Sequence, residues 1–369
     1  AKRISLCTRE TDTVARLGGD EFTIILTELR DVASVEQVAT HILSLLSVPY
    51  RLGNEIVHAS GSIGITLYPR DATDTEGLLK NADQAMYVAK NIGRGSFSYF
   101  TQALQEAAQS RLRLINDLRT AIEGDQFELY YQPIVDLSTG GIYKAEALIR
   151  WKHPTRGLVG PAEFIPLAED TGLIVQIGDW VFREAAQQSQ RLRTLYHPAF
   201  QISINKSPKQ FRDNPGNSMA WLEYLDAHQQ TGSSMAVEIT EGLLLNVETE
   251  VTDKLSAFAS AGVQIAIDDF GTGYSSLAYL KRFEIDFLKI DRTFVRDIET
   301  DANDMALSQA IIVMAHALGI KVVAEGVETE DQRQLLLNAG CDFAQGFLFS
   351  KPLPVELFEA MLLDKRKQN

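Results

Sequence analysis

The feature that most constrains the fold of this chain is a regular alternation of short apolar runs and longer helical segments that begins near Leu129. The runs are rich in β-branched residues, which is typical of βα units that form a mainly parallel sheet. The eight candidate strands span 129–137, 144–151, 201–205, 235–240, 264–269, 287–291, 321–325 and 343–348. Eight such units predict a closed (β/α)₈ barrel, an α/β fold whose chemistry lies at the carboxyl-terminal ends of the strands.

Polar side chains stand at or near the ends of almost all of these runs. Taken singly, each has an ordinary explanation, because Asn, Asp and Glu often cap helices or satisfy the backbone where a strand ends. Taken together, they predict a shared site at one mouth of the barrel. The residues are Glu146, Asn205, Glu238, Glu241, Asp268, Asp269, Lys289, Asp291, Glu325, Glu328 and Gln345.

Electrostatics indicates what such a mouth needs. Two carboxylates about 4 Å apart repel each other by roughly 4 kcal/mol at an effective dielectric constant near 20. Lys289 and Arg150 are the positive side chains expected nearby. Divalent cations would balance the remaining charge, and ligands that are all oxygen atoms favour Mg²⁺ or Mn²⁺ over zinc. The adjacent Asp268 and Asp269 could then reach two cations where their strand ends.

Two hard cations in one site are typical of phosphodiester hydrolysis, in which they activate a water and stabilise the leaving oxygen. Lys289 could orient that water or neutralise charge in the transition state, and the planar fork of Arg150 suits a phosphate. The residues alone therefore predict a metal-dependent hydrolase of a small phosphodiester. An enolase-like barrel, which also combines metal carboxylates with a lysine base, stays open at this level.

Composition excludes some classes of partner. A formal net charge of -14 argues against binding to a nucleic-acid polymer, which needs a clustered basic surface. No apolar run approaches the roughly 20 residues of a membrane-spanning helix, so no membrane segment is expected in this chain. Cys7 and Cys341 match no metal or redox spacing, which favours reduced thiols and a cytoplasmic location. A membrane tether elsewhere in a longer parent protein is left open.

From about residue 115 to 363 the chain resembles the EAL family of cyclic di-GMP phosphodiesterases. The resemblance depends on an ordered series of motifs, because a single Glu-Ala-Leu would carry no information. The motifs are Tyr130-Tyr131-Gln132-Pro133-Ile134, Glu146-Ala147-Leu148, Pro161-Ala162-Glu163-Phe164, Glu238-Ile239-Thr240-Glu241, Asp268-Asp269-Phe270-Gly271, Lys289-Ile290-Asp291, Ala324-Glu325-Gly326-Val327-Glu328 and Gln345-Gly346-Phe347. One departure is Lys206, where the family more often has an apolar residue.

The resemblance implies a role for each residue of the barrel mouth and two Mg²⁺ or Mn²⁺ ions. The implied metal ligands are Glu146, Asn205, Glu238, Asp268, Asp269 and Glu325. The implied catalytic residues are Lys289, Glu325, Glu146 and Asp268, with Lys289 and Glu325 at the hydrolytic water. The implied substrate-binding residues are Gln132, Leu148, Arg150, Asp291, Glu328 and Gln345. Glu241 is implied to brace the loop from Phe270 to Leu277, which couples a dimer interface to metal binding.

The first hundred residues resemble the later part of a GGDEF domain, the diguanylate cyclase family. The matching residues include the motif itself, Gly18, Gly19, Asp20, Glu21 and Phe22, and a possible inhibitory product site at Arg9 and Asp12. Seventeen residues precede Gly18, so we expect the opening strand of the family, with its metal-binding aspartate, to be missing and the cyclase site to be incomplete. Its role would be regulatory, or catalytic in a longer parent.

These observations predict an EAL barrel preceded by the carboxyl-terminal part of an α+β GGDEF domain. We expect residues 1–100 to form the GGDEF part, 101–116 a connecting helix and 117–369 the EAL domain. The expected reaction is metal-dependent hydrolysis of cyclic di-GMP to linear pGpG, with Ca²⁺ as an inhibitor and a homodimer through the EAL domain. The alternative is a non-catalytic cyclic di-GMP receptor, which has no need for Lys289, Glu325 and both aspartates.

Overall fold

The computed structural model describes residues 1–29, 33–53, 55–93, 95–212, 217–245, 249–271, 280 and 283–368. The chain divides into two compact units, residues 1–114 and residues 115–369. Helix α4 (Gln102–Glu123) crosses the boundary between them. No helix within the described ranges is both long enough and apolar enough to cross a bilayer.

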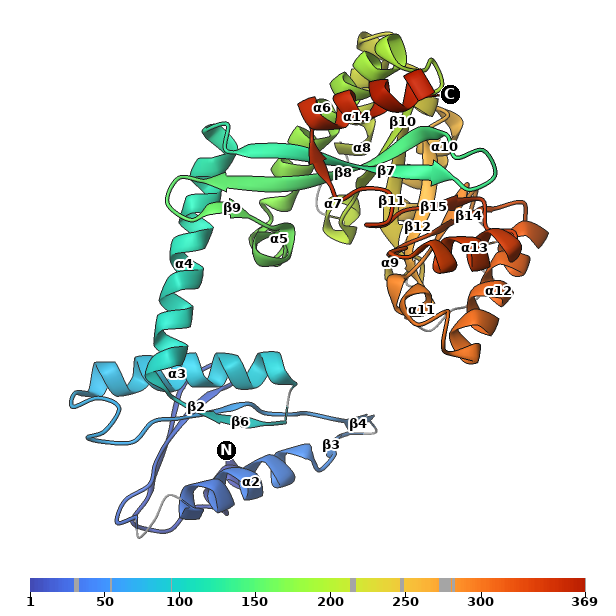
Figure 1. The fold of residues 1–369 in the computed structure, drawn as a ribbon. Coiled ribbons are helices and arrows are strands. Elements are labelled where there is room, and N and C mark those ends of the chain that lie inside the picture. Colours follow the sequence, from blue (N-terminus) through green and yellow to red (C-terminus); the bar gives the residue numbers. More distant parts are fainter. Residues whose placement is uncertain are drawn as a thin grey trace. The chain divides into compact units, whose positions relative to one another are not determined.

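The first unit combines short strands with two long helices (Figure 1). Its small core contains Val35, Ala39 and Ile65, with Phe97 and Tyr99 packed against them. Strands β5 and β6 pair in parallel, whereas β1 with β2 and β3 with β4 form antiparallel hairpins. The elements are α1 (Lys2–Ser5), β1 (Thr13–Gly18), β2 (Glu21–Ile25), α2 (Ala33–Ser47), β3 (Tyr50–Leu52), β4 (Glu55–Val57), β5 (Ile63–Ile65), α3 (Thr75–Ile92) and β6 (Phe97–Tyr99).

The second unit is a closed eight-stranded barrel, as the alternation of strands and helices predicted (Figure 1). The sheet order around the barrel is β7-β15-β14-β13-β12-β11-β10-β8, and β8 pairs back to β7. The strands are β7 (Phe127–Asp136), β8 (Ile142–His153), β10 (Gln201–Asn205), β11 (Met235–Thr240), β12 (Gln264–Phe270), β13 (Phe287–Ile290), β14 (Lys321–Ala324) and β15 (Phe343–Ala344), with β9 (Gly157–Val159) and β16 (Leu353–Pro354) at the margin.

Strand β7 differs from a regular βα unit because it runs antiparallel to both of its neighbours, β8 and β15. The segment between β7 and β8 covers residues 137–141, which is too short for the crossover that parallel strands require. Gly140 adopts a φ of +71° in this turn. The barrel therefore begins with a hairpin, and the prediction of a complete βα unit at its first strand is wrong.

Strand β15 is also shorter than the predicted run 343–348. The chain leaves the strand at Gln345 and passes close to the segment after β14. A Cβ atom on Gly346 would lie 2.0 Å from the carbonyl oxygen of Val327, so this close approach requires glycine. The tight contact bends the end of the strand and brings the Gln345 side chain to the barrel mouth.

Helices cover the outside of the barrel and bury their apolar faces on it. Helix α6 shows this well, since Ile177, Phe182 and Leu192 are almost fully buried. Inside the barrel, Ile134, Ala266, Phe287 and Val323 form a packed layer. The helices are α5 (Pro161–Thr171), α6 (Ile174–Leu195), α7 (Pro208–Arg212), α8 (Asn217–Ala227), α9 (Glu241–Leu245), α10 (Thr249–Ser260), α11 (Arg292–Arg296), α12 (Ala302–Ala317), α13 (Glu330–Asn338) and α14 (Val355–Gln368).

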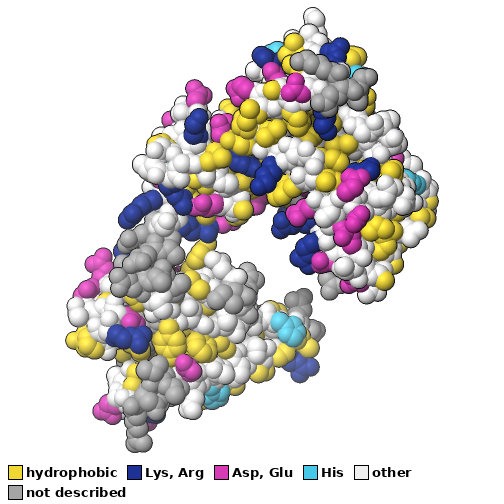
Figure 2. All heavy atoms as spheres, viewed as in Figure 1, with side chains coloured by type: hydrophobic (Ala, Val, Ile, Leu, Met, Phe, Trp, Pro, Cys, Tyr) yellow, Lys and Arg dark blue, Asp and Glu magenta, His cyan; other side chains and the backbone are white. Residues whose placement is uncertain are grey.

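Acidic and basic side chains are interspersed on the visible face of each unit (Figure 2).

Candidate active site at the carboxyl-terminal end of the barrel

One lysine and four carboxylates meet at the carboxyl-terminal ends of the barrel strands. Lys289 on β13 is 1% exposed, and its ammonium group lies at the centre of the cluster. Glu146 comes from β8, Glu238 from β11, Asp268 from β12, and Glu325 directly follows β14. The Lys289 Nζ atom lies 2.5 Å from Glu238 Oε2, 2.6 Å from Glu325 Oε1, 3.2 Å from Asp268 Oδ1 and 3.6 Å from Glu146 Oε2.

Burial and mutual repulsion dominate the electrostatics of this cluster. Burial and the charge of Glu146 raise the pKa of Glu238 well above its usual range, although Lys289 opposes the shift. Burial likewise raises the pKa of Glu325 to about 7, against the attraction of Lys289. Burial would lower the pKa of Lys289, but the surrounding carboxylates outweigh it and hold that pKa well above its usual range. Lys289 therefore remains a cation, and the acids around it compete for protons or for further cations.

Amide side chains hold Glu146 in place. The Asn205 Nδ2 atom donates to Glu146 Oε1 at 2.7 Å, and Gln345 Nε2 donates to Glu146 Oε2 at 2.7 Å. Gln345 Nε2 also lies 3.0 Å from Gln132 Oε1, and Gln132 Nε2 donates to the carbonyl oxygen of Ser350 at 3.1 Å. These contacts join four predicted site residues, and they depend on the hairpin that places Gln132 opposite Glu146.

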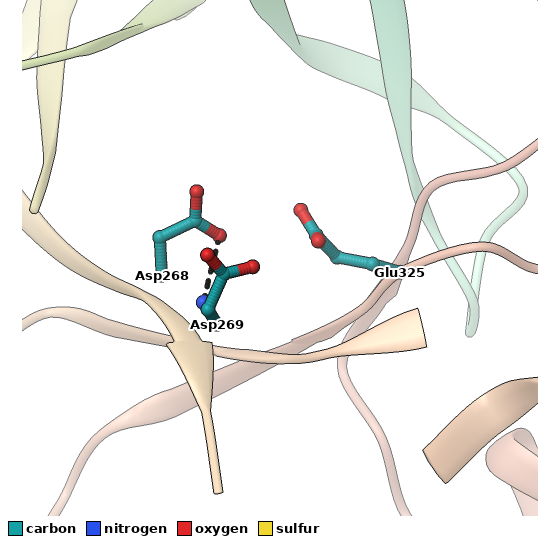
Figure 3. A group of neighbouring side chains, drawn as sticks. All are labelled: Asp268, Asp269 and Glu325. Atoms are coloured by element: carbon teal, nitrogen blue, oxygen red, sulfur yellow. Dashed lines mark hydrogen bonds between the residues drawn. The ribbon is translucent and has the colours of Figure 1, made fainter. Parts of the chain in front are cut away.

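Asp268, Asp269 and Glu325 face a common space (Figure 3). Each offers a carboxylate oxygen, and these oxygens lie within 4.8 Å of one another. Asp269 has a φ of +53°, a left-handed conformation that costs a non-glycine residue roughly 1 kcal/mol. Burial, together with the charges of Asp268 and Asp291, raises the pKa of Asp269. A strained backbone that crowds acids together is more typical of a binding site than of a helix cap.

The donor set fits hard divalent cations. It consists of carboxylates and one amide oxygen, which are the ligands that Mg²⁺ and Mn²⁺ prefer. Buried Gln345 Oε1 accepts no hydrogen bond from the described residues, so an acceptor is available beside Glu146. The structure brings Asp268, Asp269 and Glu325 within ligand distance of a shared ion, whereas Asn205 is placed beside Glu146.

The other predicted substrate-binding residues lie farther from this cluster. Arg150 is half-buried, with its guanidinium 5.4 Å from the centroid of the Tyr130 ring and one nitrogen donating to the Ile149 carbonyl. Leu148 is half-buried opposite Tyr130 in the β7–β8 pairing. Glu328 is exposed. Neither Arg150 nor Glu328 makes a side-chain hydrogen bond to the Lys289 cluster within the described part of the chain.

Asp291 has a local structural role in addition to its predicted one. Its side chain caps helix α11 by accepting a hydrogen bond from the Thr293 amide at 2.9 Å. Burial acts to raise the pKa of Asp291, but the hydrogen bonds from Thr293 outweigh it and lower that pKa. Contact between Asp291 and a substrate remains a prediction.

Glu241 opens helix α9 and is buried, with 4% of its surface exposed. Its Oε2 atom accepts a hydrogen bond from the Gly271 amide at 3.3 Å, directly after the end of β12. Residues 272–279, which make up most of the loop that Glu241 is predicted to brace, lie outside the described residues. The bracing of that loop by Glu241 stays a prediction.

Sequence reasoning missed two contributors to this site. The Ser350 carbonyl fixes Gln132, and the Tyr130 ring lies beneath the Arg150 guanidinium. The Tyr130-Tyr131-Gln132 motif could have drawn attention to Tyr130. Nothing in the sequence signals that the Ser350 backbone reaches a strand more than two hundred positions away.

In the first unit, the Gly18-to-Phe22 motif forms the turn of the β1–β2 hairpin. Gly19 adopts a φ of +50°, and its carbonyl oxygen accepts from the Arg16 guanidinium. Asp20 and Glu21 are exposed on this turn.

Asp12 bridges the two ends of the hairpin. One carboxylate oxygen accepts from the Arg9 amide at 2.8 Å and the other from the Thr27 amide at 3.1 Å. An inhibitory site at Arg9 and Asp12 stays a prediction.

Comparisons with known proteins match each of the two units to a family. The family model described as EAL domain matches residues 115–352, and the model described as Diguanylate cyclase, GGDEF domain matches residues 1–96. A bifunctional diguanylate cyclase/cyclic di-GMP phosphodiesterase, MucR of Pseudomonas aeruginosa, is 43% identical over 356 residues, covering 96% of this chain and 52% of that protein. The cyclic di-GMP phosphodiesterase PdeR of Escherichia coli is 38% identical over 353 residues, covering 96% of this chain and 53% of PdeR.

A solved structure described as PaMucR phosphodiesterase, c-di-GMP complex, has a TM-score of 0.64 and 43% identity, and covers 67% of this chain and 99% of that one. The present chain spans about half the length of the curated relatives it matches. Because the EAL model matches more than half of the chain and the motifs stand at the strand ends, the chain belongs to the EAL domain family and carries a GGDEF segment before its barrel.

Proposed function

We propose that residues 115–369 form a phosphodiesterase that hydrolyses cyclic di-GMP to linear pGpG with two divalent cations, Mg²⁺ or Mn²⁺. The observation that carries the proposal is the intact cluster at the barrel mouth, where four carboxylates surround one buried lysine. The 43% identity to a phosphodiesterase solved with c-di-GMP supports the choice of substrate. A protein that only binds the dinucleotide would not need this crowding of acids.

The residues that would hold the cations fall into two groups. Glu146, Asn205, Glu238 and Asp268 would hold one ion, and Asp269 would join the second, with Glu325 beside it. When bound, such ions activate a water for attack and stabilise the oxygens of an in-line displacement at phosphorus. The buried acids would give up protons to the solvent as cations enter, because carboxylates bind metals in their ionised form.

The protein's own groups would do the positioning. Lys289 is held by carboxylates on several sides, so its ammonium is fixed before substrate arrives. It would donate a hydrogen bond to the attacking water or to a phosphate oxygen and neutralise the charge that develops there. Glu325, 2.6 Å from Lys289, would accept a hydrogen bond from the same water. Because this charge is already in position, the site does not have to reorganise during the reaction, as solvent water would.

The outer residues would hold the rest of the substrate. Arg150 would bind a phosphate, because its guanidinium can pair with two phosphate oxygens at once. Gln345 would hold Glu146 in position, and Gln132 would hold Gln345. Leu148, Asp291 and Glu328 would contact the nucleotide or the metal shell. These last three assignments depend on the family resemblance alone.

The roles of the GGDEF segment and of a homodimer interface are also proposed from the family resemblance. The GGDEF segment would regulate the barrel or belong to a cyclase site completed in a longer protein. The Glu241–Gly271 hydrogen bond would pass a change at a homodimer interface to Asp268 and Asp269. A cytoplasmic location remains a prediction.

The direct test is incubation of the purified chain with cyclic di-GMP and Mg²⁺ or Mn²⁺, followed by chromatography of the products. We expect linear pGpG to appear with metal and to be absent in EDTA. The matched variant is Asp268→Asn, which removes one charge without changing the shape of the side chain and should reduce hydrolysis by at least about 10³-fold. Tight binding of cyclic di-GMP without any pGpG would favour a receptor and contradict the proposal.

A further inference from the structure

A cavity of about 520 Å³ opens at the amino-terminal end of the barrel, away from the Lys289 cluster. Lys144, Gln201 and Gln264, near the amino-terminal ends of β8, β10 and β12, line it. These positions precede Glu146, Asn205 and Asp268 by two to four residues on the same strands, which is roughly 7–13 Å along a strand. None of the residues predicted for catalysis lines this cavity.

Lys144 lines the cavity, where burial and nearby Lys321 lower its pKa and the attraction of Asp286 only partly offsets them. It donates to Gln201 Oε1 and to Gln264 Oε1, the latter at 3.4 Å, and both acceptors are neutral amides. It also lies 4.2 Å from the centroid of the Phe287 ring. In the described part of the chain, no acid lies within ion-pair distance of Lys144. A poorly hydrated cation of this kind gains most from an added anion.

A second cation, Arg193 near the end of α6, lines the same cavity. One of its nitrogens donates to the Phe200 carbonyl at 3.2 Å. A guanidinium has five N–H donors, and Arg193 makes no other hydrogen bond to described residues. Its remaining fork is therefore free to bind a carboxylate or phosphate with two parallel bonds.

Two acids, Asp286 and Glu284, also line the cavity and offset part of this positive charge. Asp286 is already engaged, since its Oδ1 accepts from Gln264 Nε2 at 3.0 Å and its Oδ2 accepts from the Ile265 amide at 2.8 Å. Glu284 is exposed at the rim. The cavity thus presents two cations, neutral amides and Asp286, whose two oxygens already accept hydrogen bonds, with Glu284 exposed at the rim.

We propose that this cavity binds a small organic anion, with its phosphate or carboxylate group held between Lys144 and Arg193. The volume lies within the range of 300–1,000 Å³ that is usual for small-molecule sites. Glu284 at the rim would repel a second anionic group, so a ligand with one anionic end and a neutral or hydroxylated body fits best.

Isothermal titration calorimetry with three probes tests the site: inorganic phosphate, glycerol 3-phosphate and acetate. Phosphate and acetate alone separate the two anionic groups, and glycerol 3-phosphate adds a hydroxylated body. The protein is first freed of metal by dialysis, and the titration is run without chelator and without cyclic di-GMP. We expect at least one probe to bind with a Kd below about 1 mM. Absence of binding by all three probes up to about 10 mM would overturn the proposal, whatever the hydrolysis assay shows.

Substitutions of the residues that line the cavity test whether the probe binds there. Lys144→Met and Arg193→Gln should each weaken the probe that binds by about tenfold or more. Glu284→Gln should change affinity in the opposite direction and tighten binding a few-fold, because it removes a negative charge from the rim. This third variant keeps the test valid if either cation variant folds poorly. Lys152→Met, an exposed lysine farther along β8, is the control and should bind as the wild type does. Equal affinity in all four variants would refute the site.

Discussion

The two ends of the barrel each place a lysine among different neighbours. At the carboxyl-terminal end, Lys289 lies within 3.6 Å of four carboxylates. At the amino-terminal end, Lys144 contacts the amide oxygens of Gln201 and Gln264 and the face of Phe287. Both lysines also line one small gap of about 20 Å³ inside the barrel. The same residue type therefore stands in an acidic setting at one end and in a neutral setting at the other.

The difference in charge between the two ends determines which kind of ligand each end can accept. Four carboxylates against one ammonium leave a formal charge of 1 − 4 = −3 at the carboxyl-terminal end before any proton binds. That end attracts cations and repels bare phosphate. At the amino-terminal end, no carboxylate of the described residues lies within ion-pair distance of Lys144, and Asp286 already accepts two hydrogen bonds, so this end could accept an anion. One barrel can thus hold metal ions and a small anion at opposite ends without competition between them.

Replacement of Lys289 should have the largest effect on hydrolysis and on stability. A small effect would contradict the contrast between the two ends of the barrel. Lys289→Met should reduce hydrolysis by about 10³-fold, because it deletes the fixed positive charge that faces the phosphate. In EDTA the variant should also be less stable by roughly 3–5 kcal/mol, because the carboxylates lose their partner. Product chromatography measures the first effect, and thermal unfolding followed by circular dichroism measures the second.

Lys321→Met is the matched control for that experiment. Lys321 begins β14 at the amino-terminal end and is exposed. We expect its replacement to leave hydrolysis within about twofold of wild type and stability within about 0.5 kcal/mol. If Lys289→Met also left hydrolysis and stability near wild type, Lys289 would not be required by the surrounding carboxylates. The proposed contrast between the two ends of the barrel would then be wrong.

Exchange of the metal should give the next largest effect. With Ca²⁺ in place of Mg²⁺, hydrolysis should fall by at least about 10²-fold, because Ca²⁺ is larger and accepts a looser geometry. Added Ca²⁺ should also inhibit the Mg²⁺-dependent reaction. The rate of pGpG formation across a series of Ca²⁺ concentrations measures both effects. Undiminished turnover with Ca²⁺ alone would show that the carboxylates do not demand a small octahedral ion.

Much of the carboxyl-terminal end could be predicted from the sequence, because parallel strands end at one edge of a barrel. A polar residue at the end of each apolar run is enough to bring Glu238, Asp268, Lys289 and Glu325 together. The direction of β7 could not be predicted from hydrophobic periodicity, which is the same for a parallel and an antiparallel strand. It depends instead on the length of the turn at residues 137–141, which decides whether a crossover can form.

The finer contacts could not be predicted, for two physical reasons. The bond between Gln345 and Glu146 depends on a close backbone approach at Gly346, which is a tertiary constraint. The amino-terminal end has no motif at all, since Lys144 and Gln201 are isolated polar residues near the beginnings of apolar runs. Such residues are common in ordinary strands, and only the cavity that they share indicates a binding role.

A third lysine, Lys206, is buried and extends the comparison to stability. Its Nζ atom lies 3.4 Å from the centroid of the Trp221 ring and is also near Phe211, and burial lowers its pKa to about 7. Below pH 7 the lysine is charged in both the folded and unfolded states, and the folded state bears the full cost of burial. Above pH 7 the unfolded chain binds more protons, so this residue makes wild-type stability rise with pH.

Lys206→Met should therefore raise the free energy of unfolding by roughly 1–4 kcal/mol at pH 6. The advantage over wild type should shrink by about 1.4 kcal/mol per pH unit above 7, as the wild-type lysine loses its proton on folding. Urea unfolding in EDTA at pH 6, 7 and 8 measures the difference. Lys152→Met on the exposed face of β8 should show no such trend. A destabilised Lys206→Met at pH 6 would mean that the contacts of this lysine outweigh the cost of its burial.

The last prediction concerns how tightly the residues next to Lys144 are packed at the amino-terminal end. Cys341 lies just before β15 and is 4% exposed, and its thiol donates to the Phe343 carbonyl at 3.3 Å. Burial raises its pKa to about 12, so at pH 8 roughly one thiol in 10⁴ is a thiolate. Cys7 in the first unit is partly exposed. With Cys7→Ser and Cys341→Ser as single-thiol chains, an aromatic disulfide reagent at pH 8 should label Cys7 at least about 10³-fold faster than Cys341.

The pH dependence of that labelling separates two explanations for a slow Cys341. If the reagent reaches the thiol in the folded state, the rate should rise about tenfold from pH 8 to pH 9, because the thiolate fraction rises tenfold per unit below the pKa. If labelling needs local unfolding, the rate should instead follow the thiolate fraction of an ordinary cysteine and increase less steeply. Labelling of Cys341 as fast as Cys7 would contradict the closed packing around Phe343, whose ring lies 5.8 Å from the Lys144 ammonium. Lys144 would then stand in a more hydrated setting, which would weaken its attraction for an anion.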